Sequence, residues 1–233
     1  MTPRGHTATA ASGLGDPPHD PQPLRSLPAA EHVDRLHRLS EYSRPWWFAA
    51  VDHLDDARGG RFDLTVPHGT CYLAESLDGA LVEKLLRTRN KVVVAERLAE
   101  LFHAQIAVRA APTVADLTSP AVTAHGLNAE IHTTLDYRPT RRWARALRRA
   151  GWRGLRYLLR GDVAAVQAGR ALFGGAGLHT RAPAGLSTTV APLDRELAEQ
   201  LLRARGVEVR PIPADVPITA PPGTTPPRGS PHG

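Results

Sequence analysis

The stretch "GGRFDLTVPHGTCYLAESLDGALVEKLL", from Gly59 to Leu86, holds the densest pattern in the sequence. It joins a glycine–arginine turn, a short strand with an aromatic residue, and a helix that carries a glutamate. Ser76 or Asp78 can cap that helix at its first turn. The pattern therefore predicts a turn, a strand over residues 69–74 and a helix, one directly after the other.

Three polar side chains of this stretch are candidates for a ligand site. Arg61, in the turn, can hold a phosphate or carboxylate through two hydrogen bonds. The ring of Tyr72 can stack on a planar group. Glu83 lies one helical turn after Gly79 and Ala80, which leaves room beside its carboxylate to stabilise a developing cation. Each residue alone also fits a structural role, but their combination favours a binding site.

The segments around this stretch predict an α+β fold with flanking helices. Helices and strands alternate without a regular βαβ repeat, and in "RPWWF" Pro45 blocks the continuation of any helix formed by "HVDRLHRLS". Helical patterns span residues 92–103, 140–151 and 193–206, and extended patterns span residues 104–118, 154–159, 169–174 and 207–212.

The two ends of the chain predict disordered tails. Residues 1–30 and 213–233 are rich in proline and glycine and lack an apolar period, which leaves one domain over residues 31–212. The N-terminal residues lack the apolar segment of a signal peptide, and apolar runs such as Val92–Ala95 are too short to cross a bilayer. The single cysteine, Cys71, fits a reducing cytoplasm. We therefore expect a cytoplasmic protein without a membrane segment.

The net charge of +6 is concentrated in one block, where nine arginines and no acidic residue lie between Arg138 and Arg160. This block can bind phosphates or nucleic acid, or it can be a solvated or partner-binding helix face. Four of its side chains lie away from the apolar stripe around Trp143: Arg141, Arg145, Arg148 and Arg149. Because no aromatic residues of the stacking kind alternate with them, we favour the solvated or partner-binding face over nucleic acid. The eleven histidines show no metal-ligand spacing, so no metal site is expected.

The order of several motifs resembles the RES-domain family, named for an arginine, a glutamate and a serine. The matching motifs, from about residue 35 to 175, are "LHRL", "PWWF", "GGRFD", "GTCYLAES", "GALVEKL", "ADLT", "RRWARALRRAGWRGLRY" and "ALFG". The resemblance implies an ADP-ribosyltransferase-like split sheet with a cleft for NAD. It also implies a toxin that cleaves the nicotinamide–ribose bond of NAD by hydrolysis or phosphorolysis, or transfers ADP-ribose to a protein. NAD is then a substrate, no separate cofactor is needed, and the implied partner is an Xre-type helix-turn-helix antitoxin.

The resemblance also implies roles for individual residues. The family arginine falls on Arg38, the turn arginine on Arg61, the strand tyrosine on Tyr72 and the glutamate on Glu83. Glu83 is then expected to stabilise the oxocarbenium-like ribose. Arg38 and Arg61 are expected to hold the phosphates, and Tyr72 to pack against nicotinamide or ribose. No metal is required, because nicotinamide leaves as a neutral ring.

One position departs from the family pattern. The family serine falls on Leu159 in "RYLLRGD", and Arg160 matches the basic residue that follows it. Leucine neither donates nor accepts a hydrogen bond, and loss of a transition-state donor typically lowers the rate about a hundredfold or more. The alternative is therefore a catalytically weakened scaffold that binds a nucleotide or a protein partner.

Overall fold

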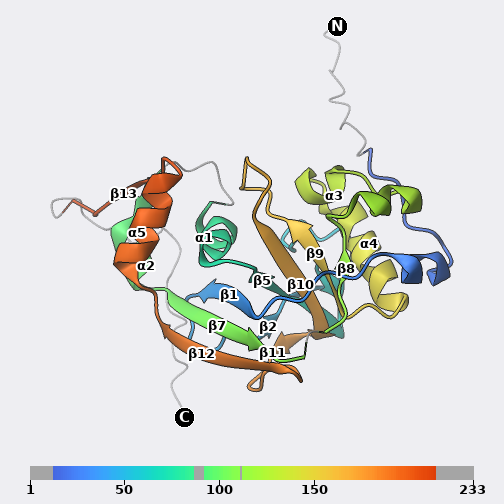
Figure 1. Ribbon diagram of the computed structural model, residues 1–233, viewed down its shortest axis with the longest axis horizontal. Coiled ribbons are helices and arrows are strands. Elements are labelled where there is room, and N and C mark those ends of the chain that lie inside the picture. Colours follow the sequence, from blue (N-terminus) through green and yellow to red (C-terminus); the bar gives the residue numbers. More distant parts are fainter. Residues whose placement is uncertain (1–12, 87–91, 111, 214–233) are drawn as a thin grey trace, which may run out of the picture.

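The computed structural model describes residues 13–86, 92–110 and 112–213. Its centre is a seven-stranded sheet in the order β12-β7-β1-β5-β10-β9-β8 (Figure 1). Its strands are β1 (Arg35–Ser40), β5 (His68–Ala74), β7 (Phe102–Val108), β8 (Ala115–Asp116), β9 (Gly154–Leu158), β10 (Ala168–Gly175) and β12 (Leu186–Pro192). The pairs within it are antiparallel except β8 with β9. The predicted α+β class is confirmed.

The sheet is split between β1 and β5. Strand β1 pairs with β7 over its whole length, and β5 pairs with β10 over its whole length. By contrast, β1 and β5 share the single pair His37 and Ala74. The half β12-β7-β1 therefore diverges from the half β5-β10-β9-β8, and the predicted split sheet is confirmed.

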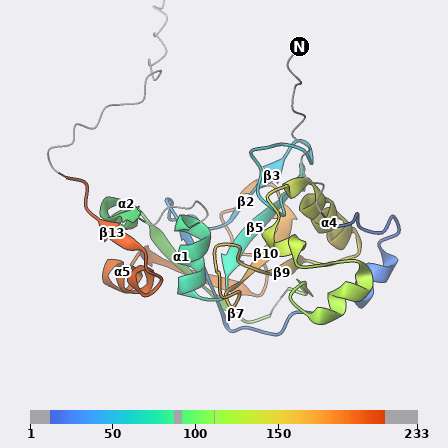
Figure 2. The same ribbon diagram turned by 90° about the horizontal axis from the view of Figure 1, so that it is seen from above.

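The helices lie at the two ends of the sheet (Figures 1 and 2). Helices α1 (Leu77–Leu85), α2 (Ala95–Ala99) and α5 (Arg195–Ala204) gather at one end, and α3 (Glu130–Thr133) and α4 (Tyr137–Arg149) at the other. The remaining elements are short: η1 (Gln22–Ser26), β2 (Trp47–Phe48), β3 (Ala50–Val51), β4 (Leu64–Thr65), β6 (Val92–Val94), η2 (Pro120–His125), β11 (Gly177–Leu178) and β13 (Glu208–Arg210). No helix in the described part of the chain is long and apolar enough to span a membrane.

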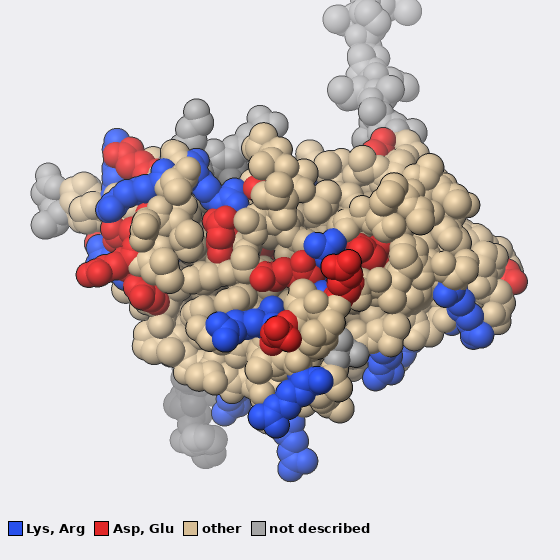
Figure 3. All heavy atoms as spheres, in the orientation of Figure 1, with Lys and Arg blue, Asp and Glu red and all other residues tan. Residues whose placement is uncertain are grey.

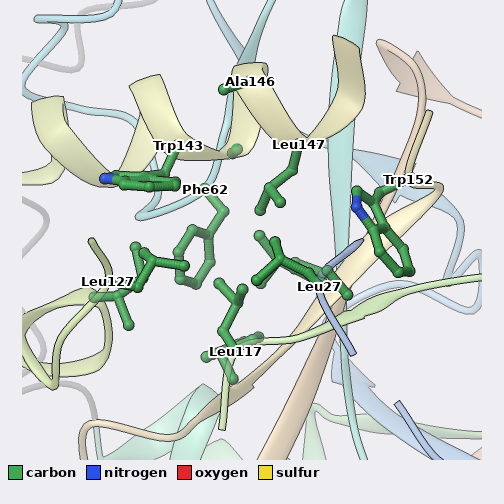
Figure 4. Packing of buried hydrophobic residues seen from close by; sticks show 14 of the residues in the cluster. Leu27, Phe62, Leu117, Leu127, Trp143, Ala146, Leu147 and Trp152 are labelled. Carbon is green, nitrogen blue, oxygen red and sulfur yellow. The ribbon is translucent and has the colours of Figure 1, made fainter. Parts of the chain in front are cut away.

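The largest hydrophobic cluster packs beneath α4 (Figure 4). Trp143 and Leu147 project from that helix toward Phe62, and all three side chains are fully buried. Phe62 follows Arg61 directly, so the core anchors one end of the turn that the sequence singled out.

The N-terminal segment belongs to this core, so the prediction of disorder is wrong for residues 13–30. Leu24 is fully buried, and its carbonyl accepts a 2.8 Å hydrogen bond from Trp152 Nε1. Trp143 Nε1 donates to the Gly15 carbonyl at 2.8 Å. Isolated leucines that each fill one gap produce no period, which is why the sequence pattern missed them. Residues 1–12 and 214–233 lie outside the described residues.

Two local predictions also need correction. Residues 35–40 form strand β1 rather than part of a helix, since they pair with β7 along their whole length. The helix predicted over residues 92–103 is confined to α2, because the β-branched run of β6 pairs in parallel with β13. The helix predicted after Ser76 is confirmed, and its cap is Ser76, whose Oγ accepts the 2.8 Å hydrogen bond of the Gly79 N–H.

Candidate functional site

A cleft of about 1150 Å³ opens where the sheet splits. Strand β1 contributes one wall, β5 contributes a second, and α1 and the turn before Phe62 lie at its sides. All four residues predicted from the sequence line this cleft: Arg38, Arg61, Tyr72 and Glu83. The structure therefore brings together side chains that are up to 45 positions apart in the chain.

The turn that presents Arg61 is held by close packing. A Cβ atom on Gly59 would lie 2.2 Å from Cγ1 of Val51, and one on Gly60 would lie 2.8 Å from the Tyr72 hydroxyl. Only glycine fits at both positions. Helix α4 fixes the turn from the other side, because Arg141 Nε donates a 2.9 Å hydrogen bond to the Gly60 carbonyl.

Arg61 itself is a buried cation with open hydrogen-bonding capacity. Its side chain is 8% exposed, and its Cζ lies 5.8–6.0 Å from the ring centroids of Phe62, Tyr137 and Tyr157. Its Nε and Nη1 have no hydrogen-bond partner among the described residues. Burial lowers the pKa of Arg61, and the nearby Tyr157 and Glu83 oppose that shift. A buried guanidinium with unused donors is suited to binding an anionic ligand.

The Tyr72 hydroxyl is already engaged within the protein. It donates a 2.7 Å hydrogen bond to Oδ1 of Asp63 and accepts a 2.9 Å bond from the Phe62 N–H. Burial raises the pKa of Tyr72 well above its usual range, and the Asp63 carboxylate adds to this effect. Tyr72 therefore offers its ring, rather than the hydroxyl proton, to a ligand in the cleft.

Glu83 and Ala80 both lie on the cleft side of α1. The Glu83 side chain is half-buried. Gly79 does not contribute open space as the sequence suggested. A Cβ on Gly79 would lie 3.2 Å from Leu159 Cδ1 and 3.3 Å from Gln167 Oε1. The two small residues thus have different roles. Ala80 lines the cleft, and Gly79 lets α1 pack against the connection between β9 and β10.

Arg38, on β1, is oriented by groups of β2 and β5. Its Nη1 donates to the Trp47 carbonyl at 3.2 Å and lies 2.6 Å from Sγ of Cys71. Burial raises the pKa of the Cys71 thiol, although Arg38 opposes this shift. Cys71 is fully buried, so it acts as a structural contact for Arg38.

Leu159 lies in the core. It is 2% exposed and, among the described residues, does not belong to the lining of the cleft. Its side chain approaches Gly79 and Gly169. The next two residues, Arg160 and Gly161, do line the cleft. The side chain at position 159 therefore packs in the core and not in the cleft wall.

Arg141 and Arg156 of the arginine block make hydrogen bonds within the protein, and the expectation that Arg141 is solvated is wrong. Arg141 is 1% exposed and donates to the carbonyls of Leu54, Asp56 and Gly60 at 2.6–2.9 Å. Arg156 donates to Glu75 at 3.0–3.1 Å. Figure 3 shows basic side chains in separate places on one face, with acidic side chains between several of them. Arg145 and Arg149 are exposed, as predicted.

Among the cleft residues that were not predicted from the sequence, three lie near Arg61. Tyr137 begins α4, Tyr157 lies on β9, and Arg160 follows β9. Of these three residues, only Arg160 had a signal in the sequence, because it directly follows Leu159, the position of the family serine. Among residues 13–86, 92–110 and 112–213, no cluster of three or more His, Cys, Asp or Glu side chains could hold a metal ion.

Comparisons with known proteins support the fold and show the family. The fold is similar to that in the crystal structure of the M. tuberculosis MbcT–MbcA toxin–antitoxin complex, with a TM-score of 0.56 and 20% sequence identity. The match covers 78% of this chain and 95% of that chain, and at this identity it shows the fold. No curated protein matches the chain significantly. The RES-domain family model matches residues 32–158, more than half of the sequence. The chain therefore belongs to the RES-domain family.

Proposed function

We propose that this RES-domain protein cleaves NAD at the bond between nicotinamide and ribose. The observation that carries the proposal is the convergence of Glu83, Arg61 and Arg38 on one cleft at the split of the sheet. The cleft, at about 1150 Å³, is slightly larger than the roughly 300–1,000 Å³ typical of small-molecule sites and suits an extended dinucleotide. NAD is the substrate in this proposal, and no further cofactor takes part.

The chemistry assigned to Glu83 is electrostatic. As the bond between the ribose C1 and the nicotinamide nitrogen breaks, the electron pair leaves with nicotinamide, which becomes neutral. Positive charge then develops on the ribose, and a fixed carboxylate beside it lowers the energy of that state. An acceptor oxygen bonds to the same carbon; when the acceptor is water, it also loses a proton.

The remaining cleft residues bind and orient the substrate. Arg61 and Arg38 would hold the phosphates, because guanidinium groups match phosphate geometry. The ring of Tyr72 would pack against nicotinamide or ribose, since its hydroxyl is bonded to Asp63. The position of Leu159 in the core supports this active enzyme over the weakened scaffold, because that side chain is not part of the cleft lining in the described structure.

The identity of the group that accepts ADP-ribose is tested by identifying the reaction products. Purified protein is incubated with NAD, with and without inorganic phosphate, and nicotinamide release is followed together with the other product. Hydrolysis yields ADP-ribose, phosphorolysis yields ADP-ribose 1″-phosphate, and transfer yields a protein of increased mass. If wild-type protein and Glu83→Ala release the same background of nicotinamide under both conditions, the proposal fails.

We further propose that the protein acts in the cytoplasm as a toxin held by an antitoxin of the Xre helix-turn-helix type. The fold likeness to a structure solved as a toxin–antitoxin complex supports this proposal. Induced expression should stop growth and deplete cellular NAD, and a cognate antitoxin should restore both. If expression stops growth without depleting NAD, and the Glu83→Ala variant stops growth equally, the toxin proposal is contradicted.

A further inference from the structure

Arg160 shares one environment with Arg61. The two Cζ atoms lie 5.7 and 6.0 Å from the centroid of the Tyr137 ring. Each guanidinium carries positive charge. Burial is the main cause that lowers the pKa of Arg61, and the charge of Arg160 acts in the same direction. The fold therefore holds two like charges around a single aromatic ring at the cleft wall.

Both cations have donors that the protein does not use. Nε and Nη1 of Arg61 and Nη1 of Arg160 are buried and have no hydrogen-bond partner among the described residues. A buried donor without a partner is costly, and two neighbouring cations add repulsion to that cost. An anion with several acceptor oxygens would satisfy both requirements at once.

The backbone that carries Arg160 is fixed. Asp162 Oδ2 accepts 2.7 Å hydrogen bonds from the N–H groups of Val166 and Gln167, which closes the connection between β9 and β10. Arg205, at the end of α5, donates to Oδ1 of the same Asp162 at 3.0 Å and pairs with Asp78 of α1. The main chain that carries Arg160 is therefore held in place before any ligand binds, which lowers the entropy cost of binding.

We propose that Arg61 and Arg160, arranged around Tyr137, form a binding site for a phosphate group of the dinucleotide. This inference rests on the proposed function and adds Arg160 to the residues that hold the substrate. A phosphate presents several acceptor oxygens to two guanidinium groups, which is the geometry that arginine recognises best. The same chemistry would bind inorganic phosphate, so the test separates the two sources.

The test measures binding of three probes by calorimetry at low ionic strength: ADP-ribose, inorganic phosphate and adenosine, which lacks phosphate. The variants are Arg160→Gln and the matched control Arg145→Gln, which removes an exposed charge from α4 outside the cleft. We expect Arg160→Gln to weaken ADP-ribose binding roughly tenfold to a hundredfold, since a hydrogen bond to a charged group is lost. Adenosine binding should not change, and Arg145→Gln should match wild-type protein.

The outcomes are distinct. Unchanged binding of ADP-ribose to Arg160→Gln overturns the assignment. A variant that loses only the binding of inorganic phosphate also overturns it, because Arg160 would then bind the phosphate that acts as acceptor. If ADP-ribose binding depends on Arg160 but wild-type protein releases no nicotinamide from NAD, the phosphate site stands and the proposed cleavage fails.

A measurement on wild-type protein covers the case in which Arg160→Gln does not fold. Phenylglyoxal modifies accessible arginines, and ADP-ribose, unlike adenosine, should protect the peptide that contains Arg160, which is partly exposed. Equal modification with and without ADP-ribose would overturn the proposal.

Discussion

The hydroxyl of Tyr72 donates a 2.7 Å hydrogen bond to Oδ1 of Asp63, whose other carboxylate oxygen accepts the N–H of Gly60. Strand β5 and the turn that presents Arg61 are thus joined through one buried carboxylate. This link makes the tyrosine of the cleft a support for the arginine of the cleft.

The first prediction concerns this link. Tyr72→Phe removes the hydroxyl, leaving the Phe62 N–H without its acceptor and Oδ1 of Asp63 without its donor. We expect the free energy of unfolding to fall by about 1–3 kcal/mol. Urea denaturation measures this change. Tyr42→Phe is the control, because Tyr42 is 72% exposed, and equal losses in the two variants would refute the role of the link.

The second prediction concerns Leu159→Ser. Because Leu159 is 2% exposed in the core, the substitution removes apolar contacts and buries a hydroxyl. We expect a loss of about 2–5 kcal/mol in stability and no gain in nicotinamide release. Val163→Ser, at a fully exposed position of the same connection, should leave stability unchanged. A large gain in turnover on Leu159→Ser would show that the residue faces the substrate after all.

The third prediction concerns Arg205, which joins α5 to Asp78 of α1 and to Asp162 beside Arg160. Removing it should let the β9–β10 connection move and so weaken ADP-ribose binding, even though Arg205 lies outside the cleft lining in the described structure. Arg205→Ala is therefore expected to raise the KM for NAD more than it lowers kcat. Arg203→Ala, which removes an exposed arginine paired with Glu199, is the control. Identical kinetics in the two variants would exclude a positioning role.

The fourth prediction is a pH dependence of stability. Burial, followed by the charge of Arg61, lowers the pKa of His132 from 6.5 to about 4. A histidine with a lowered pKa binds its proton more tightly in the unfolded chain. Its contribution to stability is therefore complete above pH 6.5 and is lost as the pH falls from 6.5 toward 4.

Between pH 7 and pH 5 this loss should amount to about 2 kcal/mol. Denaturation of wild-type protein and His132→Gln at both pH values measures it, and the variant should lose correspondingly less. The pKa of His37, lowered to about 4 by burial and by His103, contributes equally to both proteins. Parallel losses in the two proteins would mean that His132 titrates normally in the fold.

The parts of the site that the pattern of residues indicated are local, whereas Arg38 was indicated only by the family resemblance. Arg61, Tyr72 and Glu83 lie within one turn–strand–helix unit, so the helix cap and the turn glycines already indicated their relative placement. Arg160 and Tyr137 reach the same cleft from β9 and α4, and the contacts that bring them there are long-range in the chain. No periodicity within a window of sequence contains that information.

Arg141 illustrates the same limit in the core. Its spacing from the apolar stripe around Trp143 placed Arg141 on the solvated face of the helix, which is where a charged residue is expected. Its burial depends on the carbonyls of Leu54, Asp56 and Gly60, which belong to a loop about 80 residues earlier in the chain. A buried arginine is stable only where such acceptors exist, and they become visible only in the folded structure.

The central claim is tested most directly by nicotinamide release from NAD by wild-type protein, Glu83→Gln and the control Glu196→Gln. Glutamine keeps the shape of the side chain and removes its charge, and Glu196 is an exposed carboxylate on α5. We predict that Glu83→Gln lowers the rate by about a hundredfold or more while Glu196→Gln retains full activity. Equal rates for all three proteins would contradict the account.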